Sequence, residues 1–232
     1  MRGAAAAALL LLASGCATVP GEGNPKDPWE GYNRRMYAFN DALDRSVLKP
    51  AAQSYQDGAP AFVQEGVANF FDNLADVGTG LNNILQGKLA DGASDLARFA
   101  VNSVVGIAGL WDVATPMGLE RHDEDFGQTL GWWGVPPGPY FIIPVLGPST
   151  VRDAPARYVD PSSAYSRYVD PQWMWYSAYA LDSVRTRAGL LKAEKVVDEA
   201  ALDRYSFLRD AWLQRRRNKV FDGHPPRDPD DE

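Results

Sequence analysis

The chain has very little cysteine and histidine for its length. Its 232 residues include one Cys, Cys16, and two His, His122 and His224. A single Cys cannot form an internal disulfide, and a Ser–His–Asp hydrolase needs a His beside its nucleophile. The sequence also lacks the G-x-S-x-G elbow of one hydrolase fold and the G-x-x-x-x-G-K-[ST] loop that holds nucleotide phosphates. We expect no enzyme activity and no cofactor, although the 30 acidic residues leave carboxylate-only catalysis open.

The chain also lacks an excess of positive charge. It has 23 Lys and Arg against 30 Asp and Glu, which gives a formal net charge of −7. Proteins bind nucleic acid through Lys and Arg, so we expect no nucleic-acid partner. Residues Arg121–Asp125 include a His and carboxylates, but five adjacent side chains cannot all face one ion, and we expect no metal site. We expect Asp123 or Asp125 to cap a following helix over Phe126–Trp132.

The N-terminal residues are typical of a targeting segment. Arg2 precedes an apolar run and a short stretch of small residues that ends at Cys16. This order is similar to a bacterial lipobox, in which the Cys is acylated; secretion with a free Cys is the alternative. The next residue, Ala17, fits the outer-membrane sorting pattern of lipoproteins. We therefore predict a signal peptide over 1–15 and a lipidated tether over 16–26.

No long apolar run in the chain is suited to a continuous helix. Phe126–Val151 has no Asp, Glu, Lys, Arg or His over 26 residues, which is the length of a membrane-spanning helix. Five prolines and five glycines interrupt it, and proline breaks a helix interior. Irregular backbone at membrane depth is tolerated only where it is buried in protein or lines a cavity. The sequence leaves these two alternatives open for an irregular Pro/Gly-rich apolar loop.

Apolar residues at helical spacing fill most of the remaining chain, and no strand-like alternation is evident. We therefore expect an all-α fold. Phe99–Trp111 is uncharged and predicts a buried helix, with a re-entrant segment as the alternative. We expect a first helix from Asp27-Pro28 to Lys49-Pro50, with Asp27 as its N-cap. A second helix is expected from about Pro60, with a break at Gly78 and Gly80. A short helix over Leu81–Leu85, closed by Gly87, and a further helix over Asp91–Ile107 are expected to follow.

The C-terminal third carries an aromatic cluster and a basic run. Trp173, Trp175, Tyr176 and Tyr179 lie near the start of an expected helix after the second of two Arg-Tyr-Val-Asp-Pro repeats. They suit a membrane interface or the edge of a core, and both stay open. A last amphipathic helix from about Ala201 ends in Arg215–Arg217 and Lys219, which we interpret as a solvated face, with lipid phosphates as an alternative partner. We predict one helical domain over 27–221 and a disordered acidic tail over 222–232.

Four long stretches together resemble the VacJ/MlaA family of outer-membrane lipoproteins, over about Asp27–Asp222. This resemblance implies a ring-like bundle of amphipathic helices in the membrane plane around a central channel. It also implies removal of mislocalised phospholipid from the outer leaflet, a trimeric porin as partner, and a soluble periplasmic lipid carrier as acceptor. The stretches are DPWEGYNRRMYAFND (27–41), NFFDNLADVGTGLNNILQGK (69–88), ARFAVNSVVGIAGLWDVA (97–114) and DFGQTLGWWGVPPGPYFIIPVLGPSTVRD (125–153).

The resemblance also implies roles for particular residues. Phe39 and Asn40 fall in the N-terminal helix motif, where the family implies control of the open state of the channel. We expect Gly134 and Gly138 to act as pivots, because Gly accepts positive φ. The competing interpretation is a lipid-anchored scaffold that docks a porin or another envelope protein without transport. The glycine-rich loop that flanks the channel is matched by Gly134, Pro136, Gly138, Pro139 and Tyr140, with Pro136 where the family often has Gly.

Overall fold

The computed structural model describes residues 24–160 and 170–226, and these are mostly helical, which confirms the expected class. The signal peptide and Cys16 lie outside the described residues. None of the described helices is long and apolar enough to cross a bilayer. The elements are α2 (Glu30–Leu43), a π-helical segment (Asp44–Leu48), α3 (Lys49–Gly58), α4 (Ala61–Leu85), α5 (Leu89–Val104), a short 3₁₀ turn (Thr115–Met117), α6 (Phe126–Trp132), β1 (Tyr140–Ile143), β2 (Gly147–Thr150), α7 (Asp153–Val159), α8 (Gln172–Ala200) and α9 (Arg204–Val220).

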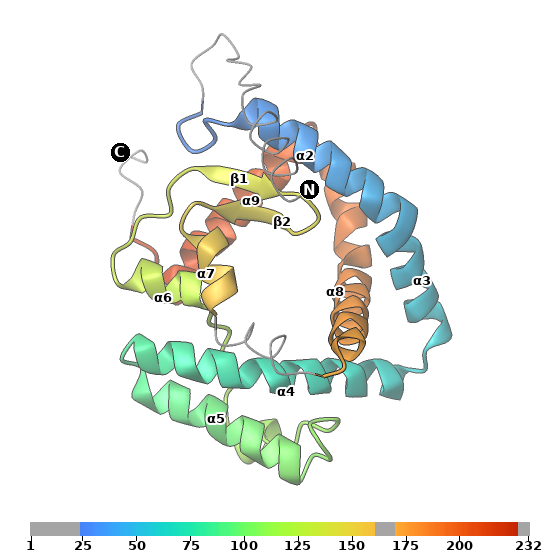
Figure 1. The fold of residues 1–232 in the computed structure, drawn as a ribbon, viewed down its shortest axis with the longest axis vertical. Helices are drawn as coiled ribbons and strands as arrows, with labels where there is room; N and C mark the ends of the chain where they lie inside the picture. Colours follow the sequence, from blue (N-terminus) through green and yellow to red (C-terminus); the bar gives the residue numbers. More distant parts are fainter. Residues whose placement is uncertain (1–23, 161–169, 227–232) are drawn as a thin grey trace.

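The elements are arranged around a central space (Figure 1). Helices α2 and α3 follow one another along one side, and α4 packs on α5 along another. The third side is a compact unit of α6, α7, α9 and the two strands, and α8 lies against α3. Several of these contacts, such as those of α3 with α8 and of α2 with β1, join elements that are distant in sequence.

The first helix is longer than predicted and starts differently. It continues past Lys49-Pro50 to Gly58, because the preceding turn widens: the N–H of Lys49 bonds to the carbonyl oxygen of Asp44, five residues back. Pro50 therefore lies in the first turn of α3, where a backbone N–H would have no partner within the helix, so the absence of an N–H on proline costs no hydrogen bond. Asp27 is not the N-cap; its buried carboxylate accepts from Asn33 Nδ2 at 2.7 Å.

The predicted break at Gly78 and Gly80 is wrong, since both lie inside the uninterrupted α4. Gly80 instead permits contact with α5. A Cβ atom on Gly92 of α5 would lie 2.7 Å from the carbonyl oxygen of Gly80, closer than atoms can pack. The expected short helix over Leu81–Leu85 is thus the end of α4, and Gly87 follows it with a φ of +81°.

The prediction of a buried helix over Phe99–Trp111 is also wrong. Helix α5 ends at Val104, whose side chain is 82% exposed, and the following turns carry exposed Ile107 and Trp111. Asn102 holds these turns in place, because its Oδ1 accepts from the backbone N–H of Val113 at 2.8 Å. The segment is an apolar surface feature.

A small β-hairpin lies within this mostly helical fold and corrects the prediction of an irregular loop over Phe126–Val151. Helix α6 occupies the first residues, and β1 pairs antiparallel with β2 in the register Tyr140 to Thr150 and Ile143 to Gly147. Each strand has only four residues. Strands this short give little alternation for a sequence pattern to detect.

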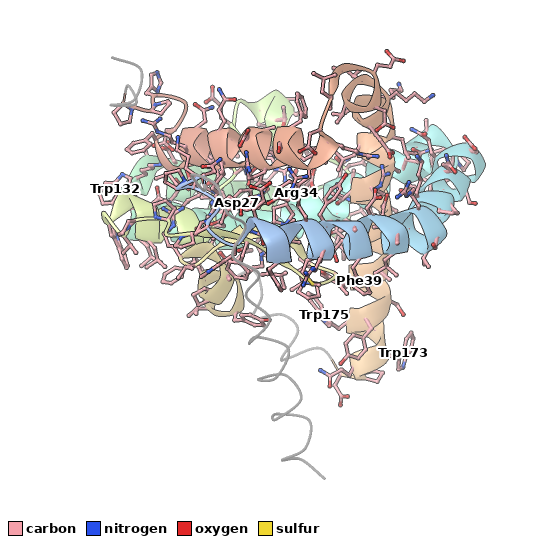
Figure 2. All side chains as sticks on the ribbon, turned by 90° about the horizontal axis from the view of Figure 1, so that it is seen from above. Asp27, Arg34, Phe39, Trp132, Trp173 and Trp175 are labelled. Carbon is pink, nitrogen blue, oxygen red and sulfur yellow. The ribbon has the colours of Figure 1, made fainter. Side chains whose placement is uncertain are left out.

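The interior of the described part is unusually polar. Nine hydrophobic residues are buried there, against twenty polar or charged ones, the reverse of the usual distribution. Large apolar side chains point outward instead. In Figure 2, Asp27 and Arg34 lie between α2 and α9, whereas Phe39, Trp173 and Trp175 lie toward the side of the molecule away from α9. Exposed apolar surface of this extent marks contact with lipid or with another protein.

Candidate functional site: a central amphipathic cavity

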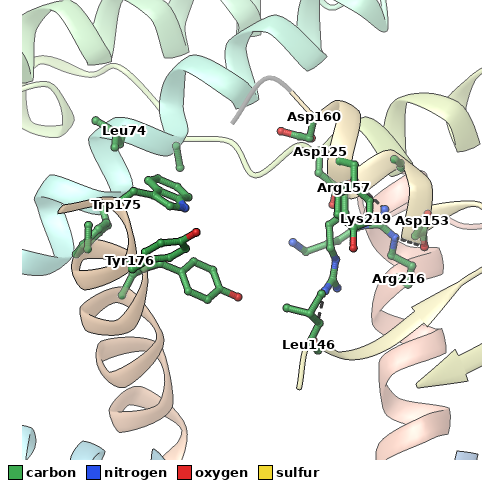
Figure 3. Close-up of a pocket in the computed structure, with 18 of the residues that line it drawn as sticks. Leu74, Asp125, Leu146, Asp153, Arg157, Asp160, Trp175, Tyr176, Arg216 and Lys219 are labelled. Carbon is green, nitrogen blue, oxygen red and sulfur yellow. Dashed lines mark hydrogen bonds and ion pairs between the residues drawn. The ribbon is translucent and has the colours of Figure 1, made fainter. Parts of the chain in front are cut away.

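A cavity of about 1090 Å³ lies at the centre of the molecule. Helices α4, α6, α7, α8 and α9 and the hairpin turn all contribute to its lining. Figure 3 shows two unlike walls that face each other across it. This volume is slightly above the usual range of small-molecule sites, which is roughly 300–1,000 Å³.

One wall is apolar and aromatic. Helix α4 contributes Phe70, Phe71 and Leu74, and the start of α8 contributes Trp175 and Tyr179. Residues three and four apart lie on one helix face, so each helix presents its side chains together. The rings of Trp175 and Tyr179 lie 6.4 Å apart. This wall offers a continuous surface for hydrocarbon.

The facing wall is polar and centres on Arg216 of α9. Arg216 Nε donates to Asp153 at 2.9 Å, and Nη2 donates to Asp125 at 2.7 Å. Asp125 is also the predicted N-cap of α6, since it accepts from the backbone N–H of Gln128 at 2.9 Å, and this prediction is confirmed. Burial raises the pKa of Asp125, but the hydrogen bonds and charge of Arg216 outweigh it and lower that pKa to about 2. The Asp125 carboxylate is therefore ionised beside the cavity at neutral pH.

The position of Arg216 depends on a glycine. A Cβ atom on Gly127 would lie 2.3 Å from Arg216 Nη2 and 2.5 Å from Asp153 Oδ1. Any side chain at Gly127 would displace the guanidinium from its two carboxylates. The uncharged stretch thus includes a residue that the polar wall requires.

Asn40, a residue singled out from the sequence, contacts the hairpin and not the cavity. Its Nδ2 donates to the carbonyl oxygen of Ile143 at 3.1 Å, and its Oδ1 accepts from the N–H of Val145 at 2.7 Å. Asn40 therefore holds the turn whose next residue, Leu146, does line the cavity. Phe39 points outward from α2 and is 51% exposed.

The glycine-rich segment leads from α6 into the hairpin. Gly134 and Gly138 have φ values of +88° and +66°, with Pro136 between them. Tyr140 begins β1 and is 1% exposed; its ring packs edge-on against Trp212, with centroids 5.7 Å apart. Trp212 in turn lines the cavity. Tyr140 thus supports the wall from behind.

None of the described residues that line the cavity is among the channel residues that the resemblance implies, which are Phe39, Asn40, Gly134, Pro136, Gly138, Pro139 and Tyr140. Those residues lie in α2, in the segment between α6 and β1, and at the start of β1. Part of the lining comes from two features that the sequence left open, the aromatic cluster after Pro171 and the basic run near the end of α9. The pairing of Arg216 with Asp125 on the polar wall could not be identified from the sequence, because the two residues are 91 positions apart.

The chain resembles known proteins over most of its length. Residues 25–219 match the family model described as "MlaA lipoprotein". The chain is 33% identical over 197 residues to the "Intermembrane phospholipid transport system lipoprotein MlaA" of Escherichia coli (strain K12), which covers 82% of this chain and 76% of that protein. The protein of the same name from Haemophilus influenzae is 31% identical over 206 residues, covering 85% and 80%.

A solved structure agrees with these relatives. It is described as "Structural basis for maintenance of bacterial outer membrane lipid asymmetry" and superposes with a TM-score of 0.74 at 32% identity. The match covers 84% of this chain and 98% of the other. The sequence resemblance is thereby confirmed, and the chain belongs to the MlaA lipoprotein family.

Proposed function

We propose that the protein is an outer-membrane lipoprotein that carries phospholipid through its central cavity. In this proposal it removes mislocalised phospholipid from the outer leaflet and passes it to a soluble periplasmic lipid carrier. The names of its relatives support phospholipid transport, and the match to a structure concerned with outer-membrane lipid asymmetry supports the location.

The observation that carries the proposal is the pairing of unlike walls in one cavity. A phospholipid has apolar chains and a charged headgroup, and moving the headgroup through hydrocarbon is costly unless polar groups accompany it. The aromatic wall of α4 and α8 suits the chains. The wall around Arg216 suits the headgroup, because it carries charged and polar side chains whose arrangement is held by the ion pairs of Arg216 with Asp125 and Asp153.

The outer surface supports a place within the membrane. Phe39, Trp132 and Trp173 are each at least half exposed, and aromatic residues favour the membrane interface. Acylation at Cys16 would attach the chain to the periplasmic side of the outer membrane, because several acyl chains give a stable anchor. We propose a trimeric porin as the neighbour in the membrane.

Lipid that co-purifies with the protein tests this function. We compare the wild type with Ala178→Trp, because Ala178 lines the cavity and a Trp there fills part of it. Ser177→Trp is the matched control, since Ser177 is an exposed neighbour outside the lining. Mass spectrometry is expected to find phospholipid with the wild type and the control and several-fold less with Ala178→Trp.

The same measurement separates transport from a scaffold role. A non-transporting scaffold would purify with a stoichiometric porin and without phospholipid, and Ala178→Trp would change neither. That result would reject the cavity as the lipid site.

A further inference from the structure

The charged residues of the cavity differ in whether a partner already neutralises them. Four cationic side chains line it: Arg157, Arg215, Arg216 and Lys219. Arg216 is bound by two carboxylates, and Lys219 pairs with Asp123. These two cations hold helices together and have little free charge to offer a ligand.

The other two cations have no carboxylate partner among residues 24–160 and 170–226. Arg157 donates to two carbonyl oxygens of the hairpin, those of Leu146 and Pro148, each at 3.3 Å. Arg215 makes no hydrogen bond or ion pair within the described residues. Both side chains are exposed. The cavity therefore has two uncompensated positive charges.

The hairpin holds Arg157 in a position that leaves donors free. A guanidinium has five N–H groups in a planar fork, and the two carbonyl oxygens use one on each terminal nitrogen. The remaining N–H groups are available to an anion, and Arg binds phosphate oxygens in bidentate geometry. The aromatic wall opposite lowers the local dielectric, which strengthens such a contact.

We propose that Arg157 and Arg215 form the site that binds the phosphodiester group of a lipid in the cavity. This inference rests on the proposed function and names the part of the ligand that the polar wall recognises. The neighbouring Arg217 does not line the cavity, and its Nη2 donates to the carbonyl oxygen of Pro226. Arg217 is therefore a control on the same helix.

Binding to the purified full chain in detergent tests the pair with three probes. Dihexanoyl phosphatidylglycerol carries the phosphodiester, dihexanoylglycerol has the same chains without it, and inorganic phosphate is the free anion. We expect Arg157→Gln and Arg215→Gln each to weaken binding of the phosphatidylglycerol about tenfold, as for one charged hydrogen bond. Binding of dihexanoylglycerol is expected to stay unchanged, and Arg217→Gln is expected to match the wild type for all probes.

Two further measurements guard against a purely structural effect. Arg157→Lys keeps the charge but lacks the planar fork, and it is expected to bind phosphatidylglycerol more tightly than Arg157→Gln and less tightly than the wild type, whereas affinity as low as that of Arg157→Gln would overturn a role for the charge of Arg157. Binding of phosphatidylglycerol is also expected to weaken with added salt, because exposed charges are screened.

The outcomes separate this inference from the proposed function. Equal binding of both lipids by the wild type and all variants would overturn the phosphodiester site and leave the cavity as a lipid site. Inorganic phosphate that binds as tightly as the lipid would also overturn it, since the site would then be one for free anions. Failure of both lipids to bind would reject the proposed function itself.

Discussion

Two asparagines of α2 take the place of a neighbouring strand for the hairpin. Asn33 and Asn40 are seven residues apart and therefore lie on one helix face. Asn33 Oδ1 accepts from the N–H of Ile142 at 2.9 Å, and its Nδ2 donates to the carbonyl oxygen of Tyr140 at 3.1 Å. Asn40 repeats this two-way contact at the turn. The edge of β1 is thus satisfied by side chains, as an exposed strand edge requires.

Loss of the Asn40 contact is expected to loosen the hairpin without unfolding the protein. Asn40→Leu keeps the side-chain size but removes two hydrogen bonds, each worth about 1 kcal/mol. Hydrogen exchange over 140–150 is expected to accelerate severalfold. Asn218→Leu, at an exposed position on α9, is the control. Unchanged exchange in Asn40→Leu would contradict the role assigned to Asn40.

Gly134 and Gly138 are expected to be essential for the motion of the segment between α6 and β1. Both have positive φ, and a Cβ on Gly138 would also lie 3.1 Å from Val151 Cβ. Replacing both with Ala costs about 1–2 kcal/mol per residue in backbone strain. We expect lower stability in thermal unfolding and reduced lipid transport.

Gly58→Ala is the control for this pair, because Gly58 has no atom within 4 Å of an added Cβ and no positive φ. Wild-type lipid transport in the double Ala variant would show that these glycines are not pivots. Pro136, between them, is expected to stiffen the segment. A Pro136→Gly variant with faster hydrogen exchange over 140–150 would support that expectation.

At the scale of elements, α2 and the hairpin act as one unit at the border of the cavity. Deleting Phe39-Asn40 turns the rest of the helix by about 200° and removes the Asn40 contacts with the turn. We expect inner-leaflet phospholipid to flow outward and accumulate in the outer leaflet. Phe39→Ala preserves the helix register and Asn40, and it is expected to behave as wild type. Unchanged outer-leaflet phospholipid in the deletion would count against this unit as a gate.

The sequence predicts the helices better than their ends, for identifiable reasons. Apolar periodicity located α5 and α9 to within a few residues and found the starts of α4 and α8, but it ended the α4 helix at Gly78 and Gly80, whereas α4 continues to Leu85. A glycine inside such a pattern is compatible with a break in the helix and with close packing against a neighbouring helix. The structure shows close packing for Gly80, because Gly92 of α5 lies directly opposite it. The hairpin was missed because its strands are short and carry Pro148. The cavity was missed because its walls join segments far apart in the chain.

In the whole molecule, ion pairs join the helices that surround the cavity, and they take the role that an apolar core has in most proteins. Glu194 of α8 is a central example, since its carboxylate accepts from Lys49 at 3.2 Å, Arg187 at 2.5 Å and Arg204 at 3.0 Å. Burial alone would raise the pKa of Glu194. The three hydrogen-bonded cations outweigh burial and lower the pKa to about 2.

This depressed pKa predicts a defined acid sensitivity. The stabilisation by Glu194 is present above its ordinary pKa of about 4.5 and is lost as pH falls toward about 2. We expect Glu194→Gln to lower the free energy of unfolding at pH 7 by about 2 kcal/mol, because it leaves three partly buried cations without their shared carboxylate. The gap between wild type and variant is expected to shrink between these pH values. A gap that is independent of pH, or as large for the exposed Glu65→Gln, would contradict the role of Glu194.

The central claim is that phospholipid leaves the outer leaflet through the cavity between the aromatic wall and the wall around Arg216. The most direct test measures outer-leaflet phospholipid in a strain from which this protein is deleted. The strain is complemented with the wild type, Ala178→Trp or Ser177→Trp at equal protein levels. We expect the wild type and Ser177→Trp to restore low outer-leaflet phospholipid and Ala178→Trp not to restore it. Full restoration by Ala178→Trp would contradict it.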